Sequence, residues 1–167
     1  MARVREGAGR EGARVIEIRP LGTADLDAVG EIERLSMPAP WSPAMFAGEI
    51  AKPTSVCLGA WEAGQGRLVG YVIVSRYVDA WHVMNLVVAE SHRRRGIARG
   101  LLDAVFGHTD GAGRRGFTLE VRASNDAALK LYEAMGFRRQ GVRRGYYTDN
   151  REDAVIMWRD AAGGEAA

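Results

Sequence analysis

Cysteine and lysine are both scarce in this chain of 167 residues. Cys57 is the single cysteine, which excludes an intramolecular disulfide and makes a reducing, cytoplasmic setting the expectation. Of the 23 basic residues only Lys52 and Lys130 are lysine, a bias that we attribute to overall composition rather than to phosphate binding. No apolar run approaches the roughly 20 residues that a membrane-spanning helix needs, so no membrane contact is expected.

Side chains that bind metal ions are few as well. The three histidines and one cysteine do not form a metal-binding pattern, so no metal is expected. The net charge is only +2, and no aromatic stacking motif accompanies arginine pairs such as Arg138-Arg139 and Arg143-Arg144. These arginine pairs are better interpreted as solvent-exposed surface residues than as RNA contacts, and direct nucleic-acid binding is not expected. A hydrophobic content of 47% with 26% charged residues is typical of a soluble globular protein.

The two ends of the chain differ in composition from the rest. Residues 1–14 are rich in arginine, glycine and glutamate and lack the apolar stretch of a secretory signal. We expect flexible tails at residues 1–14 and 161–167, with a single domain over residues 15–160. The sequence carries no signal for the oligomeric state.

Between the tails, short apolar segments alternate with helical patterns. Strands are predicted at residues 15–18, 55–61, 68–77, 81–88 and 117–121, and residues 137–147 are predicted to pair with 154–159 as an antiparallel hairpin. Helices are predicted after Thr23, with Leu26, Val29, Ile32 and Leu35 along one face, and at residues 43–49, 96–106 and 125–135. This order predicts an α/β (α+β) fold in which a mixed sheet is covered by helices on both faces.

One loop between a strand and a helix has the features of an anion site. Arg93-Arg94-Arg95-Gly96-Ile97-Ala98 opens the helix at residues 96–106. A helix start offers unpaired N–H groups and partial positive charge to a phosphate, and small residues let the anion approach closely. The loop is neither a P-loop nor a dinucleotide fingerprint. An arginine-rich loop before an ordinary helix would explain it equally well, so the hexamer alone is a weak signal.

The segments that follow add groups able to transfer protons. Glu120 lies near the end of the strand at residues 117–121, and Asn125 opens the next helix. Tyr132 lies on that helix, which ends at Gly136. A carboxylate can accept a proton and a phenol can donate one. Together with the anion loop, this order predicts a site that holds a pyrophosphate-containing cofactor and moves protons beside it.

With these segments in place, the sequence resembles the GCN5-related N-acetyltransferase (GNAT) superfamily. The acetyl-coenzyme A signature of that superfamily, Arg/Gln-x-x-Gly-x-Gly/Ala, is matched by Arg93–Ala98. Within it the chain is similar to the RimI-type branch, whose members acetylate the N-terminal alanine of a small-subunit ribosomal protein. The segments that carry this likeness are Leu119-Glu120-Val121-Arg122-Ala123-Ser124-Asn125, Ala128–Glu133, Met135-Gly136-Phe137, Arg144-Gly145-Tyr146-Tyr147 and Arg151–Met157.

The resemblance implies a GNAT fold, with a central mixed sheet of six to seven strands and about four helices, and acetyl-CoA as cosubstrate. It implies a general base, Glu120, and a general acid, Tyr132. The residues that it assigns to acetyl-CoA are Leu86, Val87, Val88, Arg94, Arg95, Gly96, Ile97, Ala98, Arg99 and Asn125. It places Trp41, Tyr146 and Tyr147 in the walls of a peptide entrance, and the partner would be a protein N-terminus, that of a ribosomal protein.

Simpler interpretations of single residues stay open. Glu120 could be a surface carboxylate, Tyr132 core filler, and Trp41 an aromatic plug. Asn125 suits a helix N-cap whether or not it contacts the cofactor. The side chains that fit packing or surface positions better than catalysis are Cys57, His82 and His92. A weaker hypothesis is that surface acids attract a basic ribosomal tail; these acids are Glu31, Glu33, Asp149, Glu152 and Asp153.

Other functions also stay open. An acetyltransferase of broader specificity would act on other protein N-termini, lysine side chains or small amines, because specificity lies in loops rather than in the scaffold. A coenzyme-A-binding regulatory protein would need neither Glu120 nor Tyr132. An RNA-binding module on the ribosome would show salt-sensitive affinity for RNA that does not depend on a cofactor.

Overall fold

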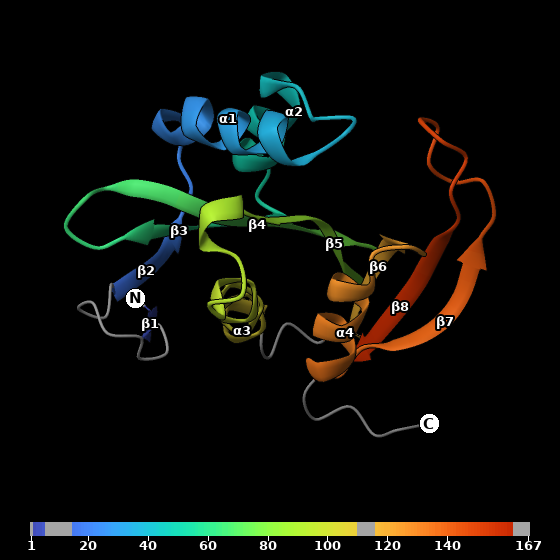
Figure 1. Cartoon of the computed structure of the whole chain (residues 1–167). Helices are drawn as coiled ribbons and strands as arrows, with labels where there is room; N and C mark the ends of the chain where they lie inside the picture. The colour runs from blue at the N-terminus through green and yellow to red at the C-terminus, as the bar shows by residue number, and fades with distance from the viewer. Residues whose placement is uncertain (1, 6–14, 110–115, 162–167) are drawn as a thin grey trace. The chain divides into compact units, whose positions relative to one another are not determined.

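The computed structural model describes residues 2–5, 15–109 and 116–161 (Figure 1). These residues fall into two compact units. Unit 1 consists of residues 1–75 and 84–109, and unit 2 of residues 76–83 and 110–167. The single domain expected over residues 15–160 stays a prediction.

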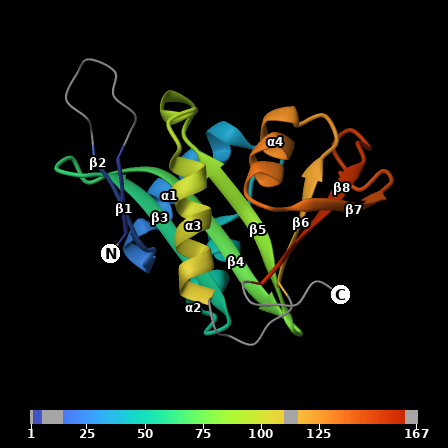
Figure 2. The same ribbon diagram turned by 90° about the horizontal axis from the view of Figure 1, so that it is seen from below.

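Unit 1 is a set of strands with helices on both faces. Its strands, in the order in which they neighbour one another, are β1 (Ala2–Arg5), β2 (Val15–Pro20), β3 (Ser55–Glu62), β4 (Arg67–Tyr77) and the second half of β5 (Ala80–Val88). Helices α1 (Leu26–Ser36) and α2 (Pro43–Ala51) lie on one face of β2–β4, and α3 (Ile97–Thr109) lies on the other (Figures 1 and 2). Strand β1 pairs antiparallel with β2, in a region where the sequence predicted a flexible tail.

The first two helices follow their sequence signals except at one residue. Ser42 caps α2 by accepting a hydrogen bond from the Met45 N–H, and Pro43 occupies the first turn. Leu35, predicted to face inward from α1, is 82% exposed. The prediction was wrong because the buried face of α1 includes Val29 and Glu33. Leu35 comes two residues after Glu33, which places it on the opposite side of the helix.

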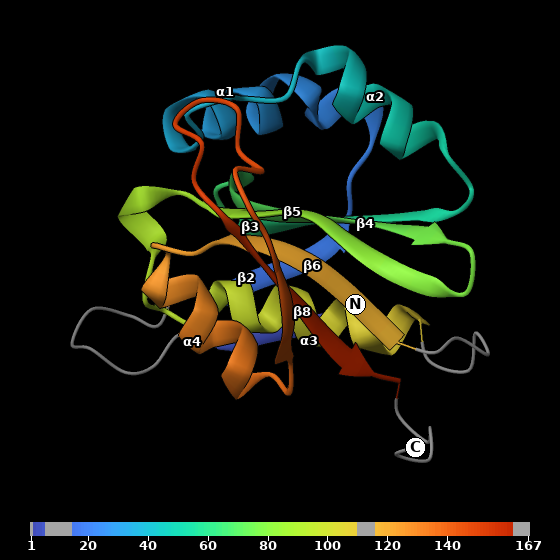
Figure 3. The ribbon, with the colours of Figure 1, turned by 90° about the vertical axis from the view of Figure 1, so that its right-hand side faces the viewer.

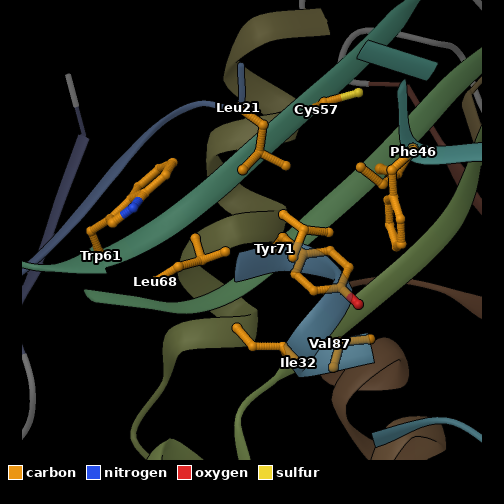
Figure 4. Close-up of a cluster of buried hydrophobic side chains, with 10 residues drawn as sticks. Leu21, Ile32, Phe46, Cys57, Trp61, Leu68, Tyr71 and Val87 are labelled. Carbon is orange, nitrogen blue, oxygen red and sulfur yellow. The ribbon is translucent and has the colours of Figure 1, made fainter. Parts of the chain in front are cut away.

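The core of unit 1 gathers apolar side chains from its strands and helices (Figure 4). Phe46 and Tyr71 are fully buried, and their rings meet edge to face with centroids 5.6 Å apart. Cys57 packs in the same cluster, and burial raises the pKa of its thiol to about 11. The burial of Cys57 in this cluster confirms its interpretation as a packing residue, and a thiol with a raised pKa stays protonated at neutral pH.

A buried carboxylate joins four segments of unit 1. Glu33 on α1 is fully buried and accepts a hydrogen bond from the Tyr71 hydroxyl on β4. It also accepts one from Asn85 Nδ2 on β5 at 2.9 Å and one from the Trp41 N–H at 3.3 Å. The hypothesis that Glu33 attracts a basic ribosomal tail is therefore wrong, because its side chain does not reach the surface. Burial and the bond to Glu33 raise the Tyr71 pKa, so its phenol remains a donor.

Removing this acceptor should destabilise the protein strongly. Glu33→Ala leaves two buried side-chain donors, on Tyr71 and Asn85, without their partner, and we expect a loss of about 2–5 kcal/mol in the free energy of unfolding. Urea unfolding followed by circular dichroism measures it. Glu31→Ala, at an exposed position on the same helix, is the matched control and should change stability by less than about 0.5 kcal/mol. Equal stability of the two variants would contradict a structural role for the network.

Unit 2 contains the first half of β5, β6 (Gly116–Arg122), α4 (Asp126–Ala134), β7 (Arg138–Arg143) and β8 (Ala154–Asp160). Strands β5 and β6 are parallel, and β8 pairs antiparallel with both β6 and β7. The predicted hairpin is confirmed, and helix α4 lies beside β8 (Figure 3). The predicted mixed sheet with four α-helices is thus confirmed, and the described residues contain eight strands once β1 is included. Within these residues, no helix is both long and apolar enough to cross a membrane.

Candidate active site

The residues predicted to hold acetyl-CoA begin at the end of β5 in unit 1. Val87 is buried among the core side chains, while Leu86 and Val88 are half-buried. The Arg93 side chain folds back and donates from Nε to the Val88 carbonyl at 3.1 Å. A short 3-10 turn, Glu90–His92, separates the strand from the arginine loop. The loop is therefore held against the strand that precedes it.

The arginine loop has the backbone geometry of an anion cradle. Arg94 and Gly96 both adopt positive φ, +62° and +78°, and a Cβ added at Gly96 would meet no atom within 4 Å. The first hydrogen bond of α3 joins Gly100 N to Gly96 O at 3.0 Å. The N–H groups of Ile97, Ala98 and Arg99 precede that bond and have no acceptor within the helix.

Side chains around the loop complete the cradle. Arg94, Arg95 and Arg99 are exposed, whereas Ile97 is buried in the core and anchors the first turn of α3. Open space at a glycine, unpaired helix N–H groups and exposed guanidinium groups together fit a pyrophosphate. The predicted assignment of residues 94–99 to that part of acetyl-CoA is chemically consistent with this arrangement.

A buried contact between a histidine and a carboxylate holds the residue just before the loop. His92 Nε2 lies 2.6 Å from Glu62 Oε1 on β3, and both side chains are at least 95% buried. His92 Nδ1 also lies 2.7 Å from the Ser91 hydroxyl. The interpretation of His92 as a packing residue is confirmed. The contacts of His92 with Glu62 and Ser91 therefore hold the chain in place where the arginine loop begins.

In unit 2, the predicted base makes a contact that the sequence did not indicate. Glu120 on β6 is 14% exposed, and its Oε2 lies 2.5 Å from His82 Nε2 on β5. Arg143 Nε lies 3.9 Å from Oε1 and is largely exposed. The hydrogen bond with His82 is the main cause that lowers the Glu120 pKa, against the opposing effect of burial. Glu120 is therefore ionised at neutral pH and paired with His82. The interpretation of His82 as a surface or packing residue rather than a base stays a prediction.

The predicted acid is a buried phenol on α4. Tyr132 is 9% exposed, and its ring meets Phe137 edge to face at 5.6 Å. Burial raises the Tyr132 pKa, and the nearby Tyr147 phenol raises it further. Among the described residues we find no hydrogen-bond partner for the Tyr132 hydroxyl. A protonated phenol near a second phenol can donate a proton, although the same ring also fills space in the core.

Tyr146 and Tyr147 lie together on the loop between β7 and β8. Their ring centroids are 5.1 Å apart, and Tyr146 is 43% exposed. Tyr147 is half-buried, and burial raises its pKa to about 12 against the opposing effect of Arg122. Glu120 also raises the Tyr147 pKa, which shows that these two side chains interact electrostatically. Unit 2 therefore brings together three of the predicted residues, Glu120, Tyr132 and Tyr147.

The late Arg151-Glu152-Asp153 segment has a clear structural role in this loop. The Arg122 guanidinium lies over the Tyr147 ring, 3.9 Å from its centroid, and donates to Asp149 at 2.9 Å. Glu152 accepts from the Ser124 N–H at 3.0 Å, and Asp153 accepts from the Gly145 N–H at 2.8 Å. These acids, predicted only as possible attractors of a basic tail, fix the loop that carries Tyr147.

Two remaining predicted residues have structural roles that do not test their functional ones. Asn125 Oδ1 accepts from the Ala128 N–H at 3.2 Å, which confirms the N-cap of α4. Trp41 is half-buried and packs on Phe46 with ring centroids 5.2 Å apart. Contact of Asn125 with acetyl-CoA and of Trp41 with a peptide stays a prediction.

Comparison with known proteins decides the family. The model of the Acetyltransferase (GNAT) family matches residues 26–137, about two thirds of the chain, and includes the arginine loop, Glu120 and Tyr132. The chain belongs to the GNAT family. It is an acetyl-CoA-dependent N-acetyltransferase, and acetyl-CoA is its cosubstrate. Across the described residues, no group of three or more His, Cys, Asp or Glu side chains could hold a metal ion.

Individual relatives of this acetyltransferase cover most of its length. It is 37% identical to N-alpha-acetyltransferase RimI of Mycobacterium tuberculosis over 87% of the chain and 93% of that protein. The crystal structure of the ribosomal-protein-S18-alanine N-acetyltransferase from Escherichia coli matches with a TM-score of 0.80 and 34% identity, over 91% of this chain and 98% of that one. The structure of Arabidopsis thaliana NAA60 in complex with acetyl-CoA matches at TM-score 0.78 and 25% identity, over 87% and 99%.

Proposed function

We propose that this acetyltransferase is a RimI-type enzyme of the cytoplasm that acetylates the N-terminal alanine of ribosomal protein S18. Support comes from relatives with that activity in their names, at 34–36% identity over 94–98% of their length. The observation that carries the proposal is the loop between β7 and β8. It is fastened by Arg122, Glu152 and Asp153, and it holds Tyr147 close enough to Glu120 for the two side chains to interact.

Glu120 takes the role of general base. A peptide N-terminus has a reference pKa of about 7.7–8.0, so much of it is ammonium at neutral pH and must lose a proton before it attacks. The N–H bond of the ammonium breaks and an O–H bond forms on the Glu120 carboxylate, directly or through one water. Because its pKa is lowered, this carboxylate is in the proton-accepting form throughout the neutral range.

Tyr132 takes the role of general acid. The amine nitrogen bonds to the acetyl carbonyl carbon of acetyl-CoA, the C–S bond breaks and the coenzyme A thiolate leaves. The Tyr132 hydroxyl donates the proton that this thiolate requires. Burial keeps the phenol protonated until then. In unit 1, Leu86–Val88 bind the acyl and pantetheine part of acetyl-CoA and residues 94–99 bind its pyrophosphate. Asn125 contacts the cosubstrate, and Trp41, Tyr146 and Tyr147 bind the peptide.

A mass-spectrometric acetylation assay tests the substrate class. Purified protein and acetyl-CoA are incubated with a peptide that begins with a free alanine, and with the same peptide blocked at its N-terminus and extended by a lysine. We expect acetylation of the free alpha-amine only. Modification of the blocked peptide would indicate a lysine or broad-range acetyltransferase. Silence on both peptides, with coenzyme A still bound, would favour a small-amine substrate or a regulatory role.

The arginine loop gives a separate prediction for acetyl-CoA. Arg94→Ala combined with Arg99→Ala should raise the Kd for acetyl-CoA by about 10–100-fold, because two charge-assisted phosphate contacts are lost. Isothermal titration calorimetry measures this Kd, and the penalty should shrink as salt is added. Arg34→Ala, an exposed arginine on α1, is the matched control. Unchanged affinity in the double variant would argue against pyrophosphate binding by this loop.

A further inference from the structure

The pairing of β5 with β6 sets His82 beside the proposed base. The two strands are parallel, with His82 opposite Thr118 in the register. Side chains two residues apart on a strand point to the same face, so Glu120 lies on the same face as Thr118 and one step further along. The His82 side chain is 29% exposed and that of Glu120 14%. This partial shielding from solvent makes the contact between them stronger than a surface pair.

The contact with His82 holds one carboxylate oxygen of Glu120, Oε2, and does not involve the other, Oε1. His82 Nε2 lies 2.5 Å from Oε2, whereas Arg143, the nearest cation to Oε1, lies at 3.9 Å with more than half of its side chain exposed. A neutral imidazole that faces a carboxylate at this distance donates from Nε2–H, because two lone pairs would otherwise repel. Tyr147 also interacts electrostatically with Glu120, and a backbone hydrogen bond helps to lower the Glu120 pKa.

We propose that His82 is a positioning residue for the acetyl-transfer reaction, which holds Oε2 of Glu120 so that Oε1 receives the proton of the substrate amine. This inference rests on the proposed role of Glu120 as base. The N–H bond of the ammonium breaks and an O–H bond forms at Oε1, while the Nε2–H bond to Oε2 keeps the carboxyl group in one orientation. A base held in one orientation loses less entropy as the transition state forms.

Two variants separate this role from simple packing. His82→Leu removes the hydrogen-bond donor and puts an apolar side chain in place of the imidazole. We expect kcat to fall by about 10–100-fold with the KM for acetyl-CoA unchanged. His82→Gln keeps an N–H donor at a similar reach and should restore kcat to within about threefold of the wild type. His108→Gln, on α3 and bonded to the Ala104 carbonyl, is the matched control and should be silent. Melting temperature and acetyl-CoA affinity are measured for each variant to confirm folding.

The pH profile gives a readout that packing would not move. His82 lowers the Glu120 pKa, so its loss should raise that pKa. Because the base is active only above its pKa, the acid limb of kcat against pH should move to higher pH in His82→Leu and stay nearer its original place in His82→Gln. The profile is measured at saturating peptide, so that it reports the enzyme–substrate complex.

A double-mutant cycle decides whether His82 acts through Glu120. If it does, His82→Leu should cause no further loss of kcat in a Glu120→Gln background. Additive losses, or a wild-type kcat and pH profile in His82→Leu, would overturn the inference. Normal kcat in Glu120→Gln alone would instead overturn the proposed base. A slow Glu120→Gln together with a normal His82→Leu would overturn only the role of His82.

Discussion

Glu120→Gln is expected to lower kcat by about 10²–10⁴-fold at neutral pH, with saturating peptide and acetyl-CoA. The amide has nearly the shape of the carboxylate and can still bond to His82, but it cannot accept the proton of the ammonium. The KM for acetyl-CoA should change little, because the residues assigned to acetyl-CoA in unit 1 are untouched. A steady-state assay that detects the released coenzyme A thiol measures both constants.

Glu133→Gln is the matched control for this substitution. Glu133 lies on α4, is about half exposed and pairs with Arg139 at 2.9 Å, so its loss should leave kcat within about twofold. Partial recovery of Glu120→Gln at high pH is also expected, since more of the peptide amine is then already neutral. If Glu120→Gln keeps the wild-type kcat, the carboxylate is not the base and a solvent water must take the proton.

Tyr132→Phe should also lower kcat by about 10²–10⁴-fold, while acetyl-CoA binds as before. Only the hydroxyl is removed, so the ring still packs against Phe137 and the core of unit 2 is preserved. The leaving thiolate then lacks its proton donor. Calorimetric titration of acetyl-CoA and single-turnover transfer, measured on the same preparation, separate binding from chemistry.

Two results would distinguish the functions of Tyr132. A variant that melts at the wild-type temperature but transfers slowly supports the acid. A variant with normal kcat shows that the phenol is core filler. Tyr77→Phe, at a side chain that is 77% exposed, is the matched control and should change neither property. Because burial raises the Tyr132 pKa, the phenol should stay protonated up to at least pH 9. Up to that pH the wild-type rate should therefore not fall through ionisation of Tyr132.

Local patterns predicted much of the fold because their causes are local. Ser42 caps α2 and Asn125 caps α4 through hydrogen bonds to the backbone N–H three residues later, and Pro43 follows Ser42 in the first turn of α2. The residues of the arginine loop likewise predict a helix start without reference to distant contacts. Leu35 shows where periodicity alone failed, since the buried face of α1 is defined by contacts with other elements. Strand β1 gave no sequence signal, because pairing with β2 rather than its own pattern makes it a strand.

Polar contacts between distant residues could not be predicted in the same way. Glu33 looks like any acid on a helix until Tyr71 and Asn85, which lie 38 and 52 residues away, supply its donors. His82 and Glu120 are 38 residues apart, and only the register of β5 against β6 brings their side chains together. A one-residue slip of that register would send Glu120 to the other face.

The sequence by itself therefore determined the family, the cosubstrate and the identity of the candidate base and acid, because these depend on motifs that are contiguous in the chain. Only the tertiary structure decided which groups surround them. It paired His82 with Glu120, placed Tyr147 near both Glu120 and Tyr132, and buried Glu33 in a network of donors. The reason is physical: pKa values and side-chain orientation depend on neighbours in space, and strand register and packing set those neighbours.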